Sequence, residues 1–462
     1  MLHTNAKEFE KELIDLCDMF YENDMPEIYH EQMLAGKLYN IITIDGKVDE
    51  YQYDMPTGSA LKQKSLRKRY ALLSLYKTLS KRENIVLPWG SFTGIRPTAL
   101  AREAVESGEI SEYATTEFLE HEFLISHDKA VLASKIIKNQ KGIIKNDHLV
   151  DFYVNIPVCP SRCAYCSFIS SERRAVEKIM PDYLQALIKE IRAMKKMMIE
   201  KALIVRNIYI GGGTPTVLEA DELEMILKEL SFKVSEFTVE CGRPETITRE
   251  KLLVLEKYGV NRICINPQTF SDATLKRIGR AHKKQDILNA YALAIEMGFK
   301  VNMDIIIGLP GEKAAAIKKT IQTLLELCPN NITIHTLSVK NGSVFKDEKP
   351  ELGFKNLAKI LTESENKVME AGYKPYYLYR QKHQLGGLEN VGFYRDNDIC
   401  QFNVDSMEET SSIIAVGANA ISKRVFSIEN RIEREPNVKF LPDYIARVDE
   451  MIARKEKLFE KV

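Results

Sequence analysis

The sequence predicts a mixed α/β protein built around a parallel sheet. Between residues 149 and 345, apolar runs of strand length alternate with amphipathic runs of helix length. This alternation favours parallel strands joined by helical crossovers. Six such units predict a partial (β/α)6 barrel of the TIM type, because a closed barrel needs eight. The expected strands are Leu149–Ile156, Val205–Ile210, Glu236–Glu240, Arg262–Ile265, Val301–Ile307 and Ile332–His335.

Amphipathic patterns fill the intervals and define a middle region, residues 149–345. Residues 1–148 mix helix and strand signals and are expected to form an α+β domain of unknown role. Residues 346–462 are expected to form a mostly helical or irregular domain on the substrate side. Polar and glycine residues gather where the strands end, and this edge is where a parallel barrel carries its active site. The expected helices are Tyr183–Met198, Ala220–Leu230, Arg249–Tyr258, Asp272–Met297 and Ala315–Leu327.

Composition excludes several classes of protein. The 462 residues include 65 basic and 65 acidic side chains, so the net charge is zero. The net charge therefore does not favour a nucleic-acid or membrane partner. The basic stretch Lys62–Arg69 follows an amphipathic pattern and is expected to be a solvated helix face. No leader segment and no apolar run of spanning length is visible, so a cytoplasmic protein without a membrane span is expected.

Three of the eight cysteines form a cluster in the loop after the first expected strand, at Cys159, Cys163 and Cys166. Three thiolates can hold a [4Fe–4S] cluster and leave one iron free for another ligand. A zinc site is the alternative that spacing leaves open, because a distant histidine could complete the four ligands zinc prefers. The dispersed cysteines are expected to be small buried side chains: Cys17, Cys241, Cys264, Cys328 and Cys400.

The spacing Cys-x3-Cys-x2-Cys, with Tyr165 between the last two, resembles the radical S-adenosylmethionine (SAM) superfamily. A glycine run, Gly211–Gly213, follows the second strand without the Lys-Ser/Thr of a phosphate loop. Further segments resemble the oxygen-independent coproporphyrinogen III oxidase/dehydrogenase family and look like its branch called HemZ. They are Tyr153–Pro157, Val239–Glu240, Asn266–Phe270, Ile278–Arg280, Asp304–Gly311, Trp89–Pro97, Tyr379–Lys382 and Leu388–Gly392.

The resemblance implies two cofactors, a [4Fe–4S] cluster on the three cysteines and SAM. It implies that Arg280, on the helix after the fourth strand, pairs with the methionine carboxylate through its guanidinium fork. Tyr153 matches a family tyrosine beside the cluster and is the candidate catalytic residue. Taken singly, each of these side chains favours a structural role, whereas their recurrence together at strand ends favours a functional one. The remaining implied SAM contacts are Gly212, Gly213 and Thr214 at the methionine end, Glu240 at methionine or ribose, and Gln268 and Asp304 at the ribose.

The activity that the resemblance implies is radical oxidative decarboxylation of coproporphyrinogen III to protoporphyrinogen IX. It also implies a tetrapyrrole as substrate and a flavodoxin- or ferredoxin-like electron donor. Two departures from the family, Asn155 in place of histidine and Phe168 in place of a further cysteine, leave other functions open. These are a heme-binding chaperone and a radical tetrapyrrole methyl- or adenosyl-transferase. Basic candidates for the substrate carboxylates are Arg277, Lys283, Arg380, Lys382 and Arg395, and His282 is expected to be an exposed helix histidine.

Overall fold

The computed structural model describes residues 1–21, 24–143, 146–168, 171–340, 342–348, 356–381, 385–427, 429 and 431–460. The chain forms two compact units. The first comprises Met1–Asn139 and Leu378–Glu389, and the second comprises Gln140–Tyr377 and Asn390–Val462. The three-domain division expected from the sequence stays a prediction. Within the described ranges, no helix is both long and apolar enough to cross a membrane.

The amino-terminal unit contains a four-stranded sheet in the order β1-β2-β3-β4. Alternate residues of β3 are buried, because helices α1 and α2 cover one face of this sheet. Five cations of α2 lie within 4.0 Å of carboxylates, so the basic stretch Lys62–Arg69 is neutralised locally, as expected of a helix face. The elements are β1 (Leu2–Thr4), α1 (Glu10–Cys17), β2 (Ile28–Leu34), β3 (Leu38–Ile44), β4 (Lys47–Tyr53), α2 (Ala60–Glu83), α3 (Pro97–Glu106), α4 (Thr115–Phe123) and α5 (His127–Asn139).

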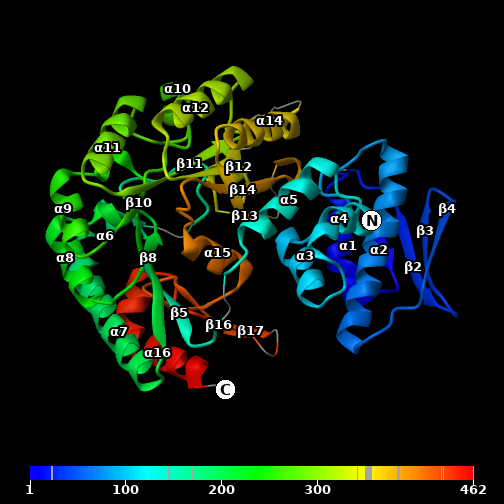
Figure 1. The fold of residues 1–462 in the computed structure, drawn as a ribbon, viewed down its shortest axis with the longest axis horizontal. Helices are drawn as coiled ribbons and strands as arrows, with labels where there is room; N and C mark the ends of the chain where they lie inside the picture. The colour runs from blue at the N-terminus through cyan, green and yellow to red at the C-terminus, as the bar shows by residue number, and fades with distance from the viewer. Residues whose placement is uncertain are drawn as a thin grey trace. The chain divides into compact units, whose positions relative to one another are not determined.

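The second unit carries the six predicted parallel strands, adjacent in the order β5-β8-β9-β10-β11-β12. Helices α7, α8, α9, α11 and α12 line the outer side of the curved sheet (Figure 1). The mixed α/β fold with a partial barrel is thus confirmed. The elements are β5 (Leu149–Ile156), α7 (Met180–Glu200), β8 (Ile204–Gly212), α8 (Ala220–Glu229), β9 (Glu236–Glu240), α9 (Arg249–Lys257), β10 (Arg262–Cys264), α10 (Asp272–Arg277), α11 (Lys284–Glu296), β11 (Lys300–Ile307), α12 (Ala314–Leu327) and β12 (Asn331–Thr336).

The single helix predicted over Asp272–Met297 is wrong, because α10 ends at Arg277 and α11 begins only at Lys284. Gly279 has a φ of +76°, which a helix cannot include. A Cβ at this glycine would lie 3.1 Å from the carbonyl oxygen of Arg162. The break therefore brings the segment around Gly279 against the cysteine loop, and Arg280 lies in this connection rather than on a helix.

Residues after 346 contribute strands to the same sheet. β14 pairs antiparallel with β12, while β15 runs parallel to β5 and continues through β16 and β17. This differs from the mostly helical or irregular tail that was expected. The elements are α13 (Val344–Glu348), α14 (Leu357–Glu370), β13 (Lys374–Arg380), β14 (Glu389–Tyr394), α15 (Gln401–Glu408), β15 (Ser412–Val416), β16 (Ile421–Phe426), β17 (Arg431–Pro436) and α16 (Leu441–Glu460).

Helix α15 covers the amino-terminal edge of the parallel strands, inside the ring of outer helices (Figure 1). Glu236, the first residue of β9, accepts hydrogen bonds from the backbone N–H groups of Gln401 (3.0 Å) and Phe402 (3.2 Å). A carboxylate is favourable at a helix amino terminus. Arg206 of β8 lies 2.6 Å from Asp405. With this edge occupied, the carboxyl-terminal edge is the one that carries the expected site residues.

Candidate functional site

The three clustered cysteines lie on one loop between β5 and α7. Cys163 is buried, while Cys159 and Cys166 are half-buried, and all three are free thiols. The loop is held by backbone hydrogen bonds from Ala164 N to Ile278 O (3.0 Å) and from Cys166 N to Cys163 O (3.1 Å). A parallel pair of short strands, β6 (Val158–Cys159) and β7 (Ser171–Glu172), brackets it. These hydrogen bonds and the strand pair therefore fix the position of the loop that carries the three thiols.

The electrostatics of the loop suit a metal cluster. Burial, together with the charges of Cys163 and Cys159, raises the pKa of Cys166 to about 11. Bound iron ions would offset this mutual repulsion between thiolates. Within the ranges that the structure describes, no three His, Cys, Asp or Glu side chains already converge as a metal site. The donor set nevertheless fits a cluster bound through three sulfurs.

The glycine run packs directly on the cysteine loop. Gly213 N donates to Ile156 O (2.8 Å), and Thr214 N donates to Val158 O (2.8 Å). A Cβ at Gly212, where φ is +109°, would lie 2.3 Å from Asn155 Oδ1. Only glycine tolerates both this φ and this approach. Thr214 Oγ1 also donates to the sulfur of Cys159 (3.6 Å). Sequence reasoning placed this run beside the cysteines, and the structure brings the two together.

Three of the expected side chains lie in or just after the carboxyl-terminal halves of neighbouring parallel strands. Glu240, the last residue of β9, accepts a hydrogen bond from Tyr209 Oη (2.8 Å), and burial raises its pKa to about 7. Asp304 of β11 lies 3.6 Å from His335 Nε2 and is partly exposed. Gln268 has a φ of +64° although it is not glycine, and its buried Oε1 has no hydrogen-bond partner among the described residues. Such strain and unsatisfied polarity are typical of ligand sites.

Arg280 links the cysteine loop to two strand ends. Its guanidinium donates to the carbonyl oxygens of Gly242 (3.0 Å) and Asn266 (2.6 Å), and to Tyr165 Oη (3.1 Å). The side chain is buried, and its Nε has no hydrogen-bond partner in the part of the chain that the structure describes. Because its hydrogen-bond partners are all neutral, the positive charge of this buried guanidinium is not neutralised by them. It is therefore suited to bind an anionic ligand.

Comparison with known proteins decides the family. The radical SAM superfamily matches residues 153–324. The oxygen-independent coproporphyrinogen-III oxidase-like protein HemZ of Bacillus subtilis is 33% identical over 488 residues, covering 100% of this chain and 97% of that protein. The chain belongs to the radical SAM superfamily. Within it, the match over both full lengths places the chain in the coproporphyrinogen oxidase family.

Two other similarities extend this result. The heme chaperone HemW of Bacillus subtilis is 34% identical over 201 residues, covering 42% of this chain and 52% of the chaperone. The solved structure of coproporphyrinogen III oxidase (HemN) from Escherichia coli aligns with a TM-score of 0.54 at 22% identity. It covers 68% of this chain and 73% of that one, and shows the shared fold. As a radical SAM protein, the chain uses a [4Fe–4S] cluster and SAM.

In this radical SAM fold, the hydroxyl of Tyr153 points along its own strand, where it donates to Asn155 Oδ1 (3.0 Å). Its ring stacks with those of Tyr209 (centroid distance 6.1 Å) and Phe402 (5.9 Å). Tyr153 is thus part of an aromatic layer inside the barrel. Its role as a catalytic residue stays a prediction.

A group that the sequence did not reveal is Arg243, Glu245 and His282. Arg243 contacts the cysteine loop, and His282 Nδ1 lies 2.7 Å from Glu245 Oε2. The expectation of an exposed helix histidine is wrong, since the His282 side chain is buried and lies between α10 and α11. These contacts join residues about 40 and 80 positions apart, so local pattern could not reveal them.

The other predicted side chains have varied outcomes. Burial is confirmed for Cys17, Cys241, Cys264 and Cys400, whereas Cys328 is exposed, so that prediction is wrong. Arg380 is buried in the amino-terminal unit, where it donates to the carbonyl oxygens of Gly387 and Phe92. Arg380 therefore links two segments of that unit, one around Phe92 and one around Gly387. Arg277 donates to Pro310 O, Arg395 pairs with Asp396, and Lys382 lies outside the described residues.

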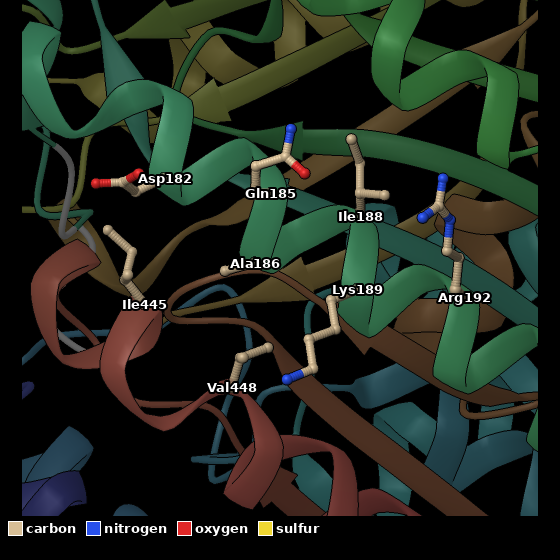
Figure 2. Close-up of a pocket in the computed structure, with 8 residues that line it drawn as sticks. All are labelled: Asp182, Gln185, Ala186, Ile188, Lys189, Arg192, Ile445 and Val448. Carbon is tan, nitrogen blue, oxygen red and sulfur yellow. The ribbon is translucent and has the colours of Figure 1, made fainter.

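A surface groove between α7 and α16 lies apart from this machinery (Figure 2). Lys189 pairs with Asp449 (2.7 Å) and Arg192 with Glu229 (2.6 Å). The two cations that line it are therefore already compensated. None of its lining residues belongs to the cysteine loop or to the carboxyl ends of the strands: Asp182, Gln185, Ala186, Ile188, Lys189, Arg192, Ile445 and Val448.

Proposed function

We propose that the protein is an oxidoreductase that converts coproporphyrinogen III to protoporphyrinogen IX by oxygen-independent oxidative decarboxylation. The observation that carries this proposal is the similarity to the coproporphyrinogen-III oxidase-like protein over the full length of both chains. The similarity to the Bacillus subtilis heme chaperone extends over less than half of this chain. The amino-terminal unit is therefore a feature shared with the oxidase-like relative.

The cofactors supply the radical chemistry when bound: an electron from the reduced cluster cleaves SAM to methionine and a 5′-deoxyadenosyl radical. The three cysteines hold the cluster in this proposal. Gly212, Gly213 and Thr214 present backbone and hydroxyl groups to the methionine end of SAM. The buried strand ends around them exclude water, which protects a reactive radical from side reactions.

The charged residues at the strand ends orient SAM in this proposal. Arg280 pairs with the methionine carboxylate, for which the buried guanidinium is suited. Glu240 meets the methionine or ribose polar groups, and Gln268 and Asp304 bind the ribose side. Because burial raises the pKa of Glu240 to about 7, a cationic ligand would favour its ionised form and expel a proton. Tyr153 is the candidate catalytic residue beside the cluster in this proposal.

The reaction removes one hydrogen atom from the β-carbon of a propionate. Loss of CO2 and of one electron then leaves a vinyl group, and the hydrogen ends on 5′-deoxyadenosine. Two propionates react in turn, each with one SAM. A flavodoxin- or ferredoxin-like donor would reduce the cluster, and an oxidised acceptor would take the electron that each decarboxylation releases.

The test is an anaerobic assay of reconstituted protein with coproporphyrinogen III, SAM and dithionite, analysed by mass spectrometry. We expect a divinyl product with two 5′-deoxyadenosines for each product molecule. Cys163→Ala is the control without a complete cluster site, and it should give neither. SAM cleavage without any loss of CO2 from the tetrapyrrole would contradict the proposed reaction.

A second candidate, a heme chaperone, is favoured by the 34% identity to HemW. It predicts stoichiometric heme binding and transfer to an acceptor protein without turnover of SAM. Heme titration of the same preparation, followed by absorbance and by 5′-deoxyadenosine analysis, separates the two functions. Tight heme binding together with an inactive oxidase assay would replace the first proposal with the second.

A further inference from the structure

Arg243 follows β9 and reaches from there to the cysteine loop. Its Nη1 donates to Ser161 O (3.2 Å) and to the sulfur of Cys163 (3.4 Å), while Nη2 donates to Ser161 Oγ (2.8 Å). The side chain is only 3% exposed. One guanidinium thus contacts both the backbone of the loop and one of the three cluster ligands.

Glu245 and His282 fix this guanidinium from the other side. Glu245 Oε1 accepts from Arg243 Nε (2.8 Å), and Glu245 Oε2 lies 2.7 Å from His282 Nδ1. Burial opposes the ionisation of Glu245, but the hydrogen bond with His282 and the charge of Arg243 lower its pKa to about 2. The carboxylate is therefore ionised at neutral pH. Such a chain of partners behind a ligand residue orients it and limits its motion.

The three cysteines differ in what surrounds their sulfurs. Cys159 accepts a neutral hydroxyl donor, Thr214 Oγ1 (3.6 Å), and Cys166 has a backbone donor at Phe168. The donor to Cys163 is a charged guanidinium, that of Arg243. Hydrogen bonds to cluster sulfurs and nearby charge help to set the reduction potential of an iron–sulfur centre. The contact between Arg243 and Cys163 is thus a place where this protein can set the potential of the cluster.

We propose that Arg243 is a positioning residue that raises the reduction potential of the cluster through a charged hydrogen bond to Cys163, with Glu245 and His282 holding its guanidinium in place. Reduction adds one negative charge to the cluster, and a nearby cation stabilises that form. The carbonyl oxygen of the adjacent Gly242 accepts from Arg280 (3.0 Å). The segment Gly242–Arg243, which follows β9, therefore contacts both the cysteine loop and Arg280, the residue proposed to bind SAM.

The experiment is an EPR-monitored redox titration of anaerobically reconstituted protein, with no tetrapyrrole present. In Arg243→Gln we expect the ratio of reduced to oxidised cluster at a fixed potential to fall about tenfold, which is about 59 mV for a one-electron couple. Arg243→Lys keeps the charge but loses the fork, so its shift should be smaller and in the same direction. Iron and sulfide analysis reports the loaded fraction, and only that fraction contributes to the EPR signal.

Arg262→Gln is the matched control, because Arg262 is a buried arginine of the same unit whose partners, Asn302, Asn331 and Glu236, lie at the opposite edge of the sheet from the cysteine loop. Its cluster should titrate at the wild-type potential. A wild-type potential in Arg243→Gln, or an equal shift in the Arg262 variant, would overturn the proposal and leave Arg243 as a structural tether. If Arg243→Gln fails to load, the Lys variant decides, and an unchanged potential there overturns the proposal. Because no tetrapyrrole is used, a failed oxidase assay leaves this result unaffected.

Discussion

At the amino-terminal edge of the parallel strands, buried charges face opposite charges, whereas at the carboxyl-terminal edge Arg280 and Glu240 hydrogen-bond to neutral groups. Arg262 lies 3.6 Å from Glu236, and Arg206 lies 2.6 Å from Asp405. At the other edge, Arg280 donates to two carbonyls and a tyrosine, and Glu240 accepts from a tyrosine hydroxyl. The charges of Arg262 and Arg206 are compensated within the chain, whereas Arg280 and Glu240 retain charge that a ligand can compensate.

This difference assigns separate tasks to the two edges. Removing one partner of a buried ion pair leaves an uncompensated charge and destabilises the fold. Removing a charge that has no ionic partner relieves a desolvation cost, so stability is retained or improved while ligand binding suffers. Substitutions at the amino-terminal edge should therefore change stability, and those at the carboxyl-terminal edge should change cofactor binding and activity.

The largest expected effect is on the cluster. Cys163→Ala should abolish SAM cleavage, because two thiolates cannot hold a cluster that needs at least three protein ligands. Iron and sulfide content and 5′-deoxyadenosine formation measure it. Cys328→Ala, which removes an exposed cysteine, should retain both. A fully loaded cluster in Cys163→Ala would break the assignment of the carboxyl-terminal edge.

At the amino-terminal edge, Arg262→Met should lower the free energy of unfolding by about 3–5 kcal/mol, since Glu236 is left buried without its cation. Urea unfolding of the apo protein measures this. The control is Arg249→Met, whose exposed pair with Glu296 should contribute only about 0–1 kcal/mol. Equal losses in the two variants would remove the distinction between a buried edge pair and a surface pair.

Glu240 should make the apo protein less stable as the pH rises. Its pKa is raised from 4.5 to about 7 in the fold, so the folded state binds this proton more tightly than the unfolded chain. Stability is thus lost between about pH 4.5 and 7, by about 3 kcal/mol at 1.36 kcal/mol per pKa unit. Glu240→Gln should remove that loss and unfold at a higher temperature at pH 8. Identical dependence of stability on pH in Glu240→Gln and in the wild type would contradict this prediction. The control is Glu250→Gln, because Glu250 is exposed.

Local pattern was enough to predict the strands, whereas the site residues that follow them came from the family resemblance and stay a prediction. The strands Glu236–Glu240 and Leu149–Ile156 have the expected bounds. They could be predicted because a run of apolar residues and the glycines near it depend on the local backbone conformation. The break at Gly279 was missed, because the amphipathic pattern continues across it and only contact with the cysteine loop explains the positive φ. Arg243 was missed because its partners lie far along the chain. Helix α15 was missed for the same reason, since its cap comes from Glu236.

The finest test of the two-edge comparison uses a single strand, β11, in which Lys300 is the first residue and Asp304 lies in the carboxyl-terminal half. If Asp304 binds the ribose of SAM, Asp304→Asn should weaken SAM binding by about 1.5–3 kcal/mol, the usual contribution of a hydrogen bond to a charged group. Lys300→Gln removes the pair with Asp398 at the amino-terminal end and should leave SAM affinity unchanged. Anaerobic equilibrium dialysis with cluster-loaded protein measures both. Because the two substitutions lie on one strand, a loss of affinity confined to Asp304 cannot be a general effect of disturbing β11, whereas equal losses would show that the strand, and not its carboxyl end, sets the affinity.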